Sequence, residues 1–317
     1  TADWVMDADN IVLERQSSIF TGSFEIYQPE NDKAYQFKDL KFVFSKHRVT
    51  DLPDTSADHL ISDNYWDNNN TQFTASFLNK QPTKKLLLYV NIGNVFRVPS
   101  VDESISNQTY PYLIFNSNDL LPEQKSMYEL GLKIENIPKE PGDRTYSLIL
   151  SGFSYSYYDK IKQLHLSGTP IKYPINFGQA SIAGIEADLS YQPTRKWISL
   201  KTCLSNYILS DPLAFQLQPE QMLRSIISIK NKWFNMDLIY RSESSRQITT
   251  IEQNGVTKQA TLKPISNIDL NIYRVFKIAF VRSTISFSGK NLNSSPQELE
   301  GISIYDRRYA LNINISL

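Results

Sequence analysis

The feature that most constrains this chain is a regular alternation of apolar and polar residues. At the C-terminus, in YALNINISL, Tyr309, Leu311 and Ile313 fall on one side of an extended strand and Asn312 and Asn314 fall on the other. The segments YELGLKIEN, SIAGIEADLSY and AFVRSTISFSG repeat the pattern. Because successive side chains of a strand point to opposite faces, each segment predicts a strand with one apolar and one polar face. Helical periodicity is hard to find, so the pattern predicts an all-β fold.

The alternation predicts thirteen strands, many of them ten residues or longer. We place them at residues 17–28, 34–47, 70–79, 84–95, 124–136, 144–162, 175–192, 196–208, 220–231, 233–245, 266–275, 278–291 and 303–317. Short and long connections alternate between them. The short ones are QPENDK, NKQPTK, IPKEPGD, QPTRK, KNK and VFK, and the long ones are 48–69, 96–123, 163–174, 209–219, 246–265 and 292–302.

Tight turns at one end of a sheet and long loops at the other are typical of an antiparallel up-and-down transmembrane β-barrel. A soluble β-sandwich also has strands with alternating apolar and polar residues, but these strands average about five or six residues. Its short and long connections need not alternate along the chain. A propeller would show a repeat of roughly 40–50 residues, and the sequence has none. The strand lengths and the polar second face favour the membrane barrel.

Composition excludes several classes of function. The 33 basic and 33 acidic residues give no net charge, so no nucleic-acid partner is implied. A single cysteine, Cys203, excludes an intrachain disulfide framework and a cysteine-based zinc site. The sequence has no His-Glu-x-x-His, no Gly-x-Ser-x-Gly and no glycine loop for phosphate. We expect a protein that is not an enzyme and that needs no cofactor.

Several short motifs then occur in a fixed order. A strand ends in Phe96-Arg97-Val98-Pro99, and the next strand begins after a Pro-Glu pair and carries Glu and Gly. A later strand has Gly-x-Glu, and an Asn-Leu pair precedes the last loop. The motif positions are Phe96, Arg97, Pro99, Pro122, Glu123, Glu129, Gly131, Gly184, Glu186, Asn291 and Leu292.

Taken together, these motifs resemble TonB-dependent outer-membrane receptors over roughly residues 35–317. The resemblance implies a 22-stranded barrel with an N-terminal plug domain, located in the bacterial outer membrane. It also implies outer-membrane lipids as surroundings, TonB as a partner through the plug, and a scarce or bulky ligand such as a siderophore, metal complex, vitamin or oligosaccharide. This chain supplies about thirteen strands and no plug, so we expect the C-terminal part of such a barrel.

The strand count also predicts the domain organisation. If the last strand runs toward the periplasm, an odd count makes the first strand run the same way. Residues 1–16 are then a surface loop or N-terminal segment, and residues 17–317 are barrel. The remaining strands and the plug would come from the same precursor or from a separate chain.

Most of the individual residues in these motifs and loops are expected to have structural roles. Arg97 and Pro99 are expected to terminate a strand, because proline cannot donate to the ladder. The loop DLPDTSADHLISDNYWDNNN lacks the ordered Asp-x-Asp-x-Asp-Gly pattern, so a solvated loop is expected rather than a calcium site. Four aromatic residues of the long loops are expected to form a ligand-binding lip at the outer end of the barrel. They are Tyr65, Trp66, Tyr110 and Tyr112.

Three functions remain open from the sequence. A receptor and transporter driven through TonB is the first. A receptor-derived barrel that anchors or scaffolds an envelope assembly is the second. A barrel lipase or protease is the third, and the missing nucleophile disfavours it.

Overall fold

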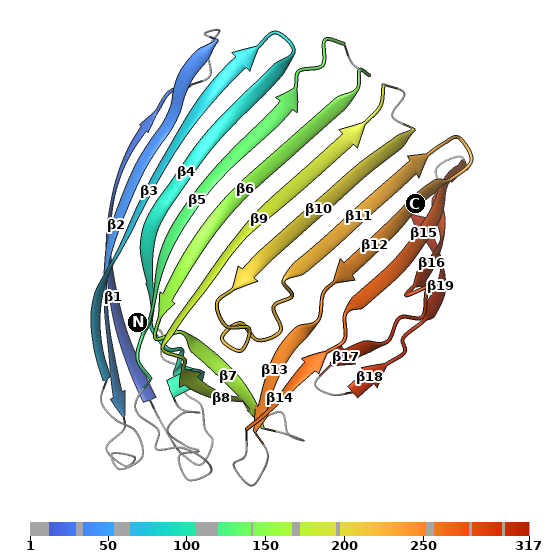
Figure 1. Ribbon diagram of the computed structural model, residues 1–317. Helices are drawn as coiled ribbons and strands as arrows, with labels where there is room; N and C mark the ends of the chain where they lie inside the picture. The colour runs from blue at the N-terminus through green and yellow to red at the C-terminus, as the bar shows by residue number, and fades with distance from the viewer. Residues whose placement is uncertain are drawn as a thin grey trace.

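The computed structural model describes most of the chain as one curved sheet with smaller sheets beneath its lower end (Figure 1). The residues described are 13–29, 34–53, 64–104, 120–140, 142–166, 172–194, 197–251, 257–278, 281–299 and 302–316. Within these residues no helix is both long and apolar enough to cross a membrane.

The large sheet contains 13 strands in the order β1-β2-β3-β4-β5-β6-β9-β10-β11-β12-β15-β16-β19, and every neighbouring pair is antiparallel. The strands are β1 (Leu13–Tyr27), β2 (Tyr35–Pro53), β3 (Asn64–Gln81), β4 (Lys84–Arg97), β5 (Glu123–Asn136), β6 (Thr145–Tyr158), β9 (Gln179–Gln192), β10 (Ile198–Leu209), β11 (Gln221–Lys230), β12 (Asn235–Glu243), β15 (Ile265–Ile278), β16 (Val281–Lys290) and β19 (Arg308–Ser316). Each of the thirteen predicted strands overlaps one of these, so the predicted meander is confirmed.

The register sorts side chains into two faces. Val90 lies opposite Leu130, and Leu130 lies opposite Gly152, whereas the next row joins Asn91, Glu129 and Phe153. Leu130 is 64% exposed although it is a leucine, because it points away from the protein. In a membrane barrel the apolar convex face meets lipid and the polar concave face lines the lumen. The two faces of this sheet fit that division.

The sheet is an open arc within the described residues. β1 and β19 lie at its two edges, and each has one neighbour, β2 and β16 respectively (Figure 1). Because all neighbours are antiparallel, the first and thirteenth strands run in the same direction. An all-antiparallel barrel therefore needs an odd number of further strands between these two edges.

A second sheet lies at the long-loop end, in the order β14-β13-β7-β8. It is formed by β7 (Ile161–Leu166), β8 (Lys172–Asn176), β13 (Arg246–Ile251) and β14 (Thr257–Leu262). β13 pairs with β7 in parallel through two residue pairs, which joins segments about 85 residues apart in the chain. Leu164 and Ile248 are fully buried in this outer sheet. The backbone N–H of Leu217 also donates to the Gln247 carbonyl, so the β10–β11 connection is attached to the same sheet.

Several predicted boundaries were wrong. The expected loop 48–69 is strand at both of its ends, because β2 continues to Pro53 and β3 begins at Asn64. The loops 163–174 and 246–265 contain parts of the outer sheet.

The expected VFK turn lies inside β15, whose register places Ile278 opposite Val281. The last predicted strand contains the end of β18 (Ile302–Ile304), which pairs with β17 (Gln297–Leu299), and then β19. β1 begins at Leu13, whereas the first predicted strand began at residue 17.

Two adjacent residues of β6 test the assignment of the faces. Leu150 lies on the apolar face, opposite Leu132 and Ala187, whereas Ile149 lies on the polar face, opposite Lys133 and Asp188. We expect Leu150→Lys to lower the free energy of unfolding by about 2–4 kcal/mol, because it places a charge in hydrocarbon. Ile149→Lys is the matched control and should cost clearly less. Denaturant unfolding in lipid vesicles measures both, and equal losses would contradict the assignment.

Candidate functional site: the luminal wall and its outer rim

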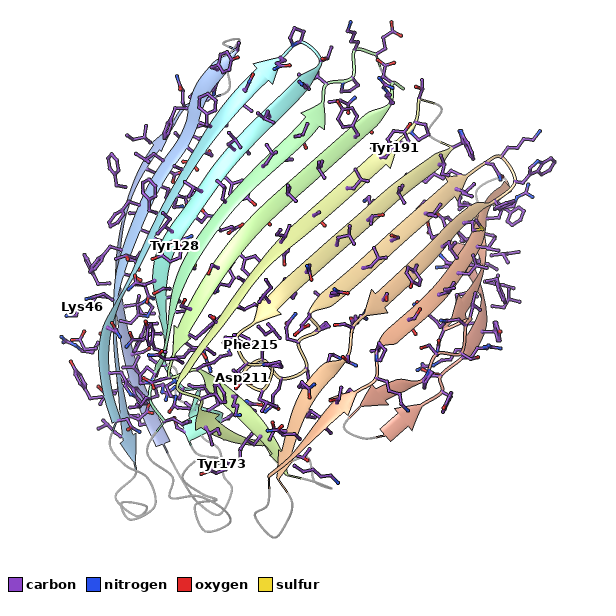
Figure 2. All side chains as sticks on the ribbon, viewed as in Figure 1. Lys46, Tyr128, Tyr173, Tyr191, Asp211 and Phe215 are labelled. Carbon is purple, nitrogen blue, oxygen red and sulfur yellow. The ribbon has the colours of Figure 1, made fainter. Side chains whose placement is uncertain are left out.

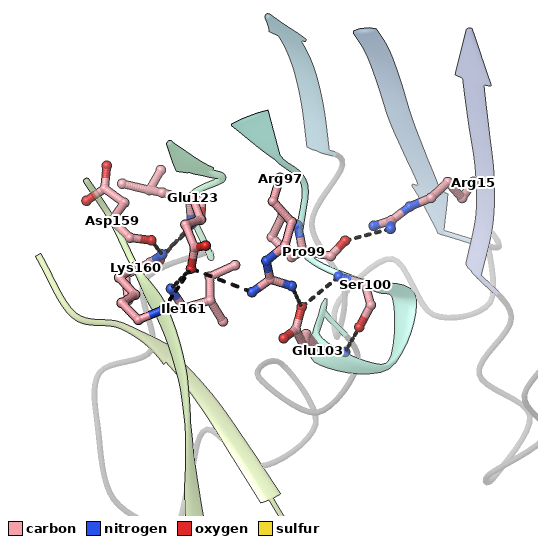
Figure 3. Close-up of polar contacts among 11 residues, drawn as sticks. Arg15, Arg97, Pro99, Ser100, Glu103, Glu123, Asp159, Lys160 and Ile161 are labelled. Atoms are coloured by element: carbon pink, nitrogen blue, oxygen red, sulfur yellow. Dashed lines mark hydrogen bonds and ion pairs between the residues drawn. The ribbon is translucent and has the colours of Figure 1, made fainter. Parts of the chain in front are cut away.

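Charged side chains gather where the strands end at the long-loop side of the sheet. We call Arg15, Asp51, Arg97, Glu103, Glu123 and Lys160 the rim cluster. Arg97 ends β4 and lies directly opposite Glu123, the first residue of β5. Its Nη1 is 2.9 Å from Glu103 Oε2 and its Nη2 is 3.9 Å from Glu123 Oε2 (Figure 3). Arg97 therefore connects two strand ends with the helical turn at residues 101–104.

A second arginine connects the first strand to the same region. Arg15 of β1 donates to both oxygens of Asp51, at 2.5 and 2.6 Å, and Asp51 is fully buried. The remaining group of the Arg15 guanidinium, Nη1, donates to the Pro99 carbonyl at 2.6 Å. Such bidentate pairing is the strong form of an arginine–carboxylate contact. One guanidinium thus holds β1, β2 and the segment after β4 together.

Glu123 joins the rim to the outer sheet. Its Oε2 accepts the Ile161 backbone N–H at 2.9 Å, and Lys160 Nζ lies 3.8 Å from the same oxygen (Figure 3). Burial lowers the pKa of the Lys160 ammonium, and Glu123 opposes that effect. Since Ile161 begins β7, the carboxylate fixes the point where the chain leaves the barrel wall.

These contacts explain the motif around Phe96. Phe96 is buried and its N–H donates to Asn70 Oδ1 on β3. Pro99 is fully buried and ends the ladder, and Ser100 N–H donates to Glu103 Oε2 at 2.8 Å. Arg97 is the last residue of β4 and Pro99 follows it; that these two residues terminate the strand stays a prediction.

Glu129 and Gly131 belong to a second arrangement, deeper on the luminal face. Tyr89 on β4 lies opposite Gly131, and a Cβ added at Gly131 would overlap the Tyr89 ring. The Tyr89 hydroxyl donates to Glu129 at 3.2 Å, and Asn91 Nδ2 donates to the other Glu129 oxygen at 3.1 Å. The glycine is thus required for the close approach of the ring.

Gly184 and Glu186 form the same unit on the other side of β6. Tyr207 lies opposite Gly184, and an added Cβ would come within 2.6 Å of the Tyr207 ring and 2.8 Å of a backbone oxygen. The Tyr207 hydroxyl donates to Glu186 at 2.6 Å. Phe153 stands between the two units, opposite both Glu129 and Gly184. The two tyrosine–glycine–glutamate units therefore flank one aromatic residue.

Phe153 belongs to a row of aromatic side chains that we call the aromatic ladder. Its members are Tyr207, Phe153, Tyr155, Tyr157 and Phe215. Ring centroids are 5.8 Å apart for Phe153–Tyr207, 4.6 Å for Phe153–Tyr155 and 5.7 Å for Tyr157–Phe215. The last ring lies in the connection after β10, at the lower end of the sheet (Figure 2). The ladder therefore runs from the middle of the wall to the outer rim.

Two lysines accompany the ladder. Lys125 Nζ lies 3.7 Å from the Tyr155 ring centroid, and Lys160 Nζ lies 4.4 Å from Tyr157 and 5.0 Å from Phe215. Ammonium groups over aromatic faces are attracted by the ring quadrupole. The ladder was not predicted from the sequence, although SGFSYSYYDK places aromatics at every second position of a predicted strand.

The Asn291-Leu292 motif forms a turn after β16. Asn291 has φ 50° and is buried, and its backbone N–H donates to Asp269. Its side-chain Nδ2 donates to the Ser295 carbonyl, and its Oδ1 accepts the Ser295 N–H. Leu292 packs over Gly289. Pro122, the remaining motif residue, stands immediately before β5.

The predicted ligand lip is only partly described. Tyr65 and Trp66 lie on strand β3 rather than in a loop, and as successive strand residues they point to opposite faces. Arg15 lies over the Trp66 ring at 5.6 Å, and the Tyr65 hydroxyl donates to Asp67. Tyr110 and Tyr112 lie outside the described residues. A lip formed by all four residues stays a prediction.

The described residues contain no group of three or more potential metal ligands. Asp51 is paired with Arg15, and Asp67 lies within 3.2 Å of both Lys46 and Arg48. These two carboxylates, both from the stretch DLPDTSADHLISDNYWDNNN, are therefore already paired with basic side chains.

A polar, aromatic-lined concave wall and an apolar convex face define the barrel class of outer-membrane proteins. The family model described as "TonB dependent receptor-like, beta-barrel" matches residues 40–292, well over half of the chain, so the chain belongs to that family. No curated protein matches the sequence.

Solved structures of such receptors share the fold. The ferric preacinetobactin receptor BauA of Acinetobacter baumannii is 12% identical, with a TM-score of 0.62, over 96% of this chain and 43% of its own. The iron transporter FrpB of Neisseria meningitidis is 10% identical, with a TM-score of 0.60, over 96% and 45%. The ferric-catecholate import receptor Fiu of E. coli K12 is 10% identical, with a TM-score of 0.62, over 95% and 45%. The chain spans less than half the length of these structures.

The rim cluster predicts the behaviour of Arg97→Gln. Loss of the guanidinium leaves Glu103 and Glu123, both buried, without this partner, so the free energy of unfolding should fall by about 1–2 kcal/mol. Hydrogen exchange at Ser100 and Ile161 should become faster. Arg48→Gln removes an exposed pair with Asp67 and should change little. Unchanged exchange at both amides would show that Arg97 does not hold the rim.

The tyrosine–glycine–glutamate unit predicts coupling between Gly131 and Tyr89. Gly131→Ala should cost about 1–3 kcal/mol, because the methyl group displaces the ring. In the double variant with Tyr89→Ala the two losses should be clearly less than additive. Gly22→Ala is the control, since an added Cβ meets nothing within 4 Å there. Additive losses in denaturant unfolding would refute the coupling.

Proposed function

We propose that this chain forms the C-terminal part of an outer-membrane receptor barrel that takes up a scarce or bulky ligand. The observation that carries the proposal is the luminal wall: charged and aromatic side chains are ordered on one face of a lipid-compatible sheet. Membership of the receptor family supports it. A siderophore, metal complex, vitamin or oligosaccharide remains the expected class of ligand.

The proposed receptor needs parts beyond the described sheet. An odd number of further strands would close the barrel, and about nine would complete the 22 strands that the family resemblance implies. A plug domain would fill the lumen and couple it to TonB. Those strands and the plug are proposed partners, either from the same precursor or from a separate chain.

The aromatic ladder and its two lysines are the proposed path of the ligand along the wall. Half-buried rings offer flat apolar surface, and ammonium groups add attraction for negative charge. The ladder ends at Phe215, so a ligand released from the outer loops would meet it first at the rim. The bacterial outer membrane is the proposed location.

The decisive experiment is an intact-mass measurement with N-terminal sequencing of everything that co-purifies from solubilised outer membranes. A tightly bound polypeptide segment carrying a plug and about nine strands supports the receptor. A lone species with the mass of this chain removes TonB-driven transport by it. A large partner that is not a plug but occupies the lumen would instead support an anchor or scaffold.

If a plug is found, uptake of labelled ligands tests the path directly. Tyr157→Ala should reduce uptake several-fold while leaving the amount of protein in the outer membrane unchanged. Tyr158→Ala, on the opposite face of the same strand, is the matched control. Equal uptake by both variants would exclude the ladder as part of the path.

A further inference from the structure

Two arginines lie side by side on the luminal wall without enough negative charge between them. Arg224 of β11 is directly opposite Arg241 of β12 in the register, so both side chains project from the same face. Directly opposed residues of antiparallel strands have Cα atoms about 4.5–5.5 Å apart. Like charges in this position destabilise a sheet unless another group neutralises them.

The carboxylate of Glu243, which contacts Arg241, is already paired with cations other than Arg224. Arg241 donates from Nε, at 2.8 Å, and from Nη2 to one oxygen of Glu243. The other oxygen of Glu243 lies 3.8 Å from Arg246. Within the described residues Arg224 forms no hydrogen bond or ion pair. Glu243 therefore compensates one of the two opposed arginines and cannot compensate both.

Other acidic groups on the wall are also engaged or distant. Asp269 pairs with Lys290 at 3.3 Å and accepts the Asn291 N–H at 2.8 Å. Asp188 belongs to the same cross-strand row, but Cys203 of β10 stands between it and Arg224. Two strand spacings correspond to about 9–10 Å. The excess positive charge thus stays at Arg224.

A cavity lies at this position. Its volume is about 570 Å³, and Arg224, Arg241 and Lys290 line it together with Glu243 and Asp269. Three cations face two carboxylates. Asn267 lies opposite Arg241 and also lines the cavity, and its Oδ1 is buried without a hydrogen-bond partner. A rotated amide would present its NH₂ group to an acceptor in the cavity.

We propose that Arg224 and Arg241 form an oxyanion site on the luminal wall. The site would take a carboxylate or phosphate group, which the planar guanidinium fork binds through paired hydrogen bonds. The five donors of Arg224 and the Nη1 group of Arg241 supply the contacts. The anion could be a free solute or a carboxylate of a polypeptide seated in the lumen. This inference does not depend on the transport proposal.

The test compares the protein with Arg224→Gln, both purified in detergent with whatever polypeptide completes the barrel. Thermal unfolding is followed in phosphate, acetate and chloride at equal ionic strength. Phosphate should raise the midpoint of the natural sequence by about 2 °C or more relative to chloride. The variant should lose that response. Comparing the two proteins removes the general stabilisation that excluded anions give any protein.

A second readout separates this site from a purely structural role. If the arginines repel each other, Arg224→Gln should unfold at a higher temperature than the natural sequence in chloride. Lys133→Gln is the matched control, because Lys133 is a luminal cation already paired with Glu135 at 2.7 Å. It should leave the phosphate response intact. Equal phosphate responses of the natural sequence and Arg224→Gln, together with unchanged association of the completing polypeptide, would overturn the proposal.

The source of the anion is distinguished in the same preparation, which contains the completing polypeptide. A phosphate response that Arg224→Gln abolishes identifies a site for diffusible anions. The absence of a phosphate response in both proteins, combined with a several-fold weaker association of the completing polypeptide in Arg224→Gln than in Lys133→Gln, identifies a carboxylate of the partner. Both results support an oxyanion site.

Discussion

Backbone hydrogen bonding between neighbouring strands is the constraint on which this structure depends. In hydrocarbon every N–H and C=O group needs a partner, so a sheet that spans a membrane must close. Thirteen strands satisfy one another side by side, but the outer edges of β1 and β19 have no neighbour within the described residues. These two edges are therefore the places where further strands would pair in the proposed receptor barrel.

Once the strands are paired, the register decides which side chains lie opposite each other. Tyr89 lies over Gly131 and reaches Glu129, and Tyr207 lies over Gly184 and reaches Glu186, because each pair belongs to directly opposed positions. The same rule places Arg224 against Arg241, where it produces excess charge instead of a satisfied contact. The wall is thus satisfied by its own contacts at the two tyrosine–glycine–glutamate units, whereas it carries excess positive charge at Arg224 and Arg241.

Prediction from the sequence succeeded where a strand has one lipid-facing side and weakened beyond the membrane. In YELGLKIEN the alternation is sharp, and β5 is found where it was expected. In NYWDNNN the outer part of β3 shows no alternation of apolar and polar residues, so the segment resembled a loop. The VFK turn was misplaced for the opposite reason. No glycine or proline marks the end of β15, and apolar residues continue to Ile278.

The sequence by itself determined the class of fold, the number of strands in the sheet, the two faces and the family motifs. These follow from local rules, because alternation, turn residues and short motifs act over a few positions. The tertiary structure alone decided the parallel pairing of β13 with β7, the rim contacts of Arg15 and Glu123, and the aromatic ladder. The contacts of Glu123 with Ile161, of Arg15 with Pro99 and of β13 with β7 join residues 38, 84 and 85 positions apart, and no local periodicity specifies which strand end meets which. Register and curvature place them together, and those emerge only when the whole sheet forms.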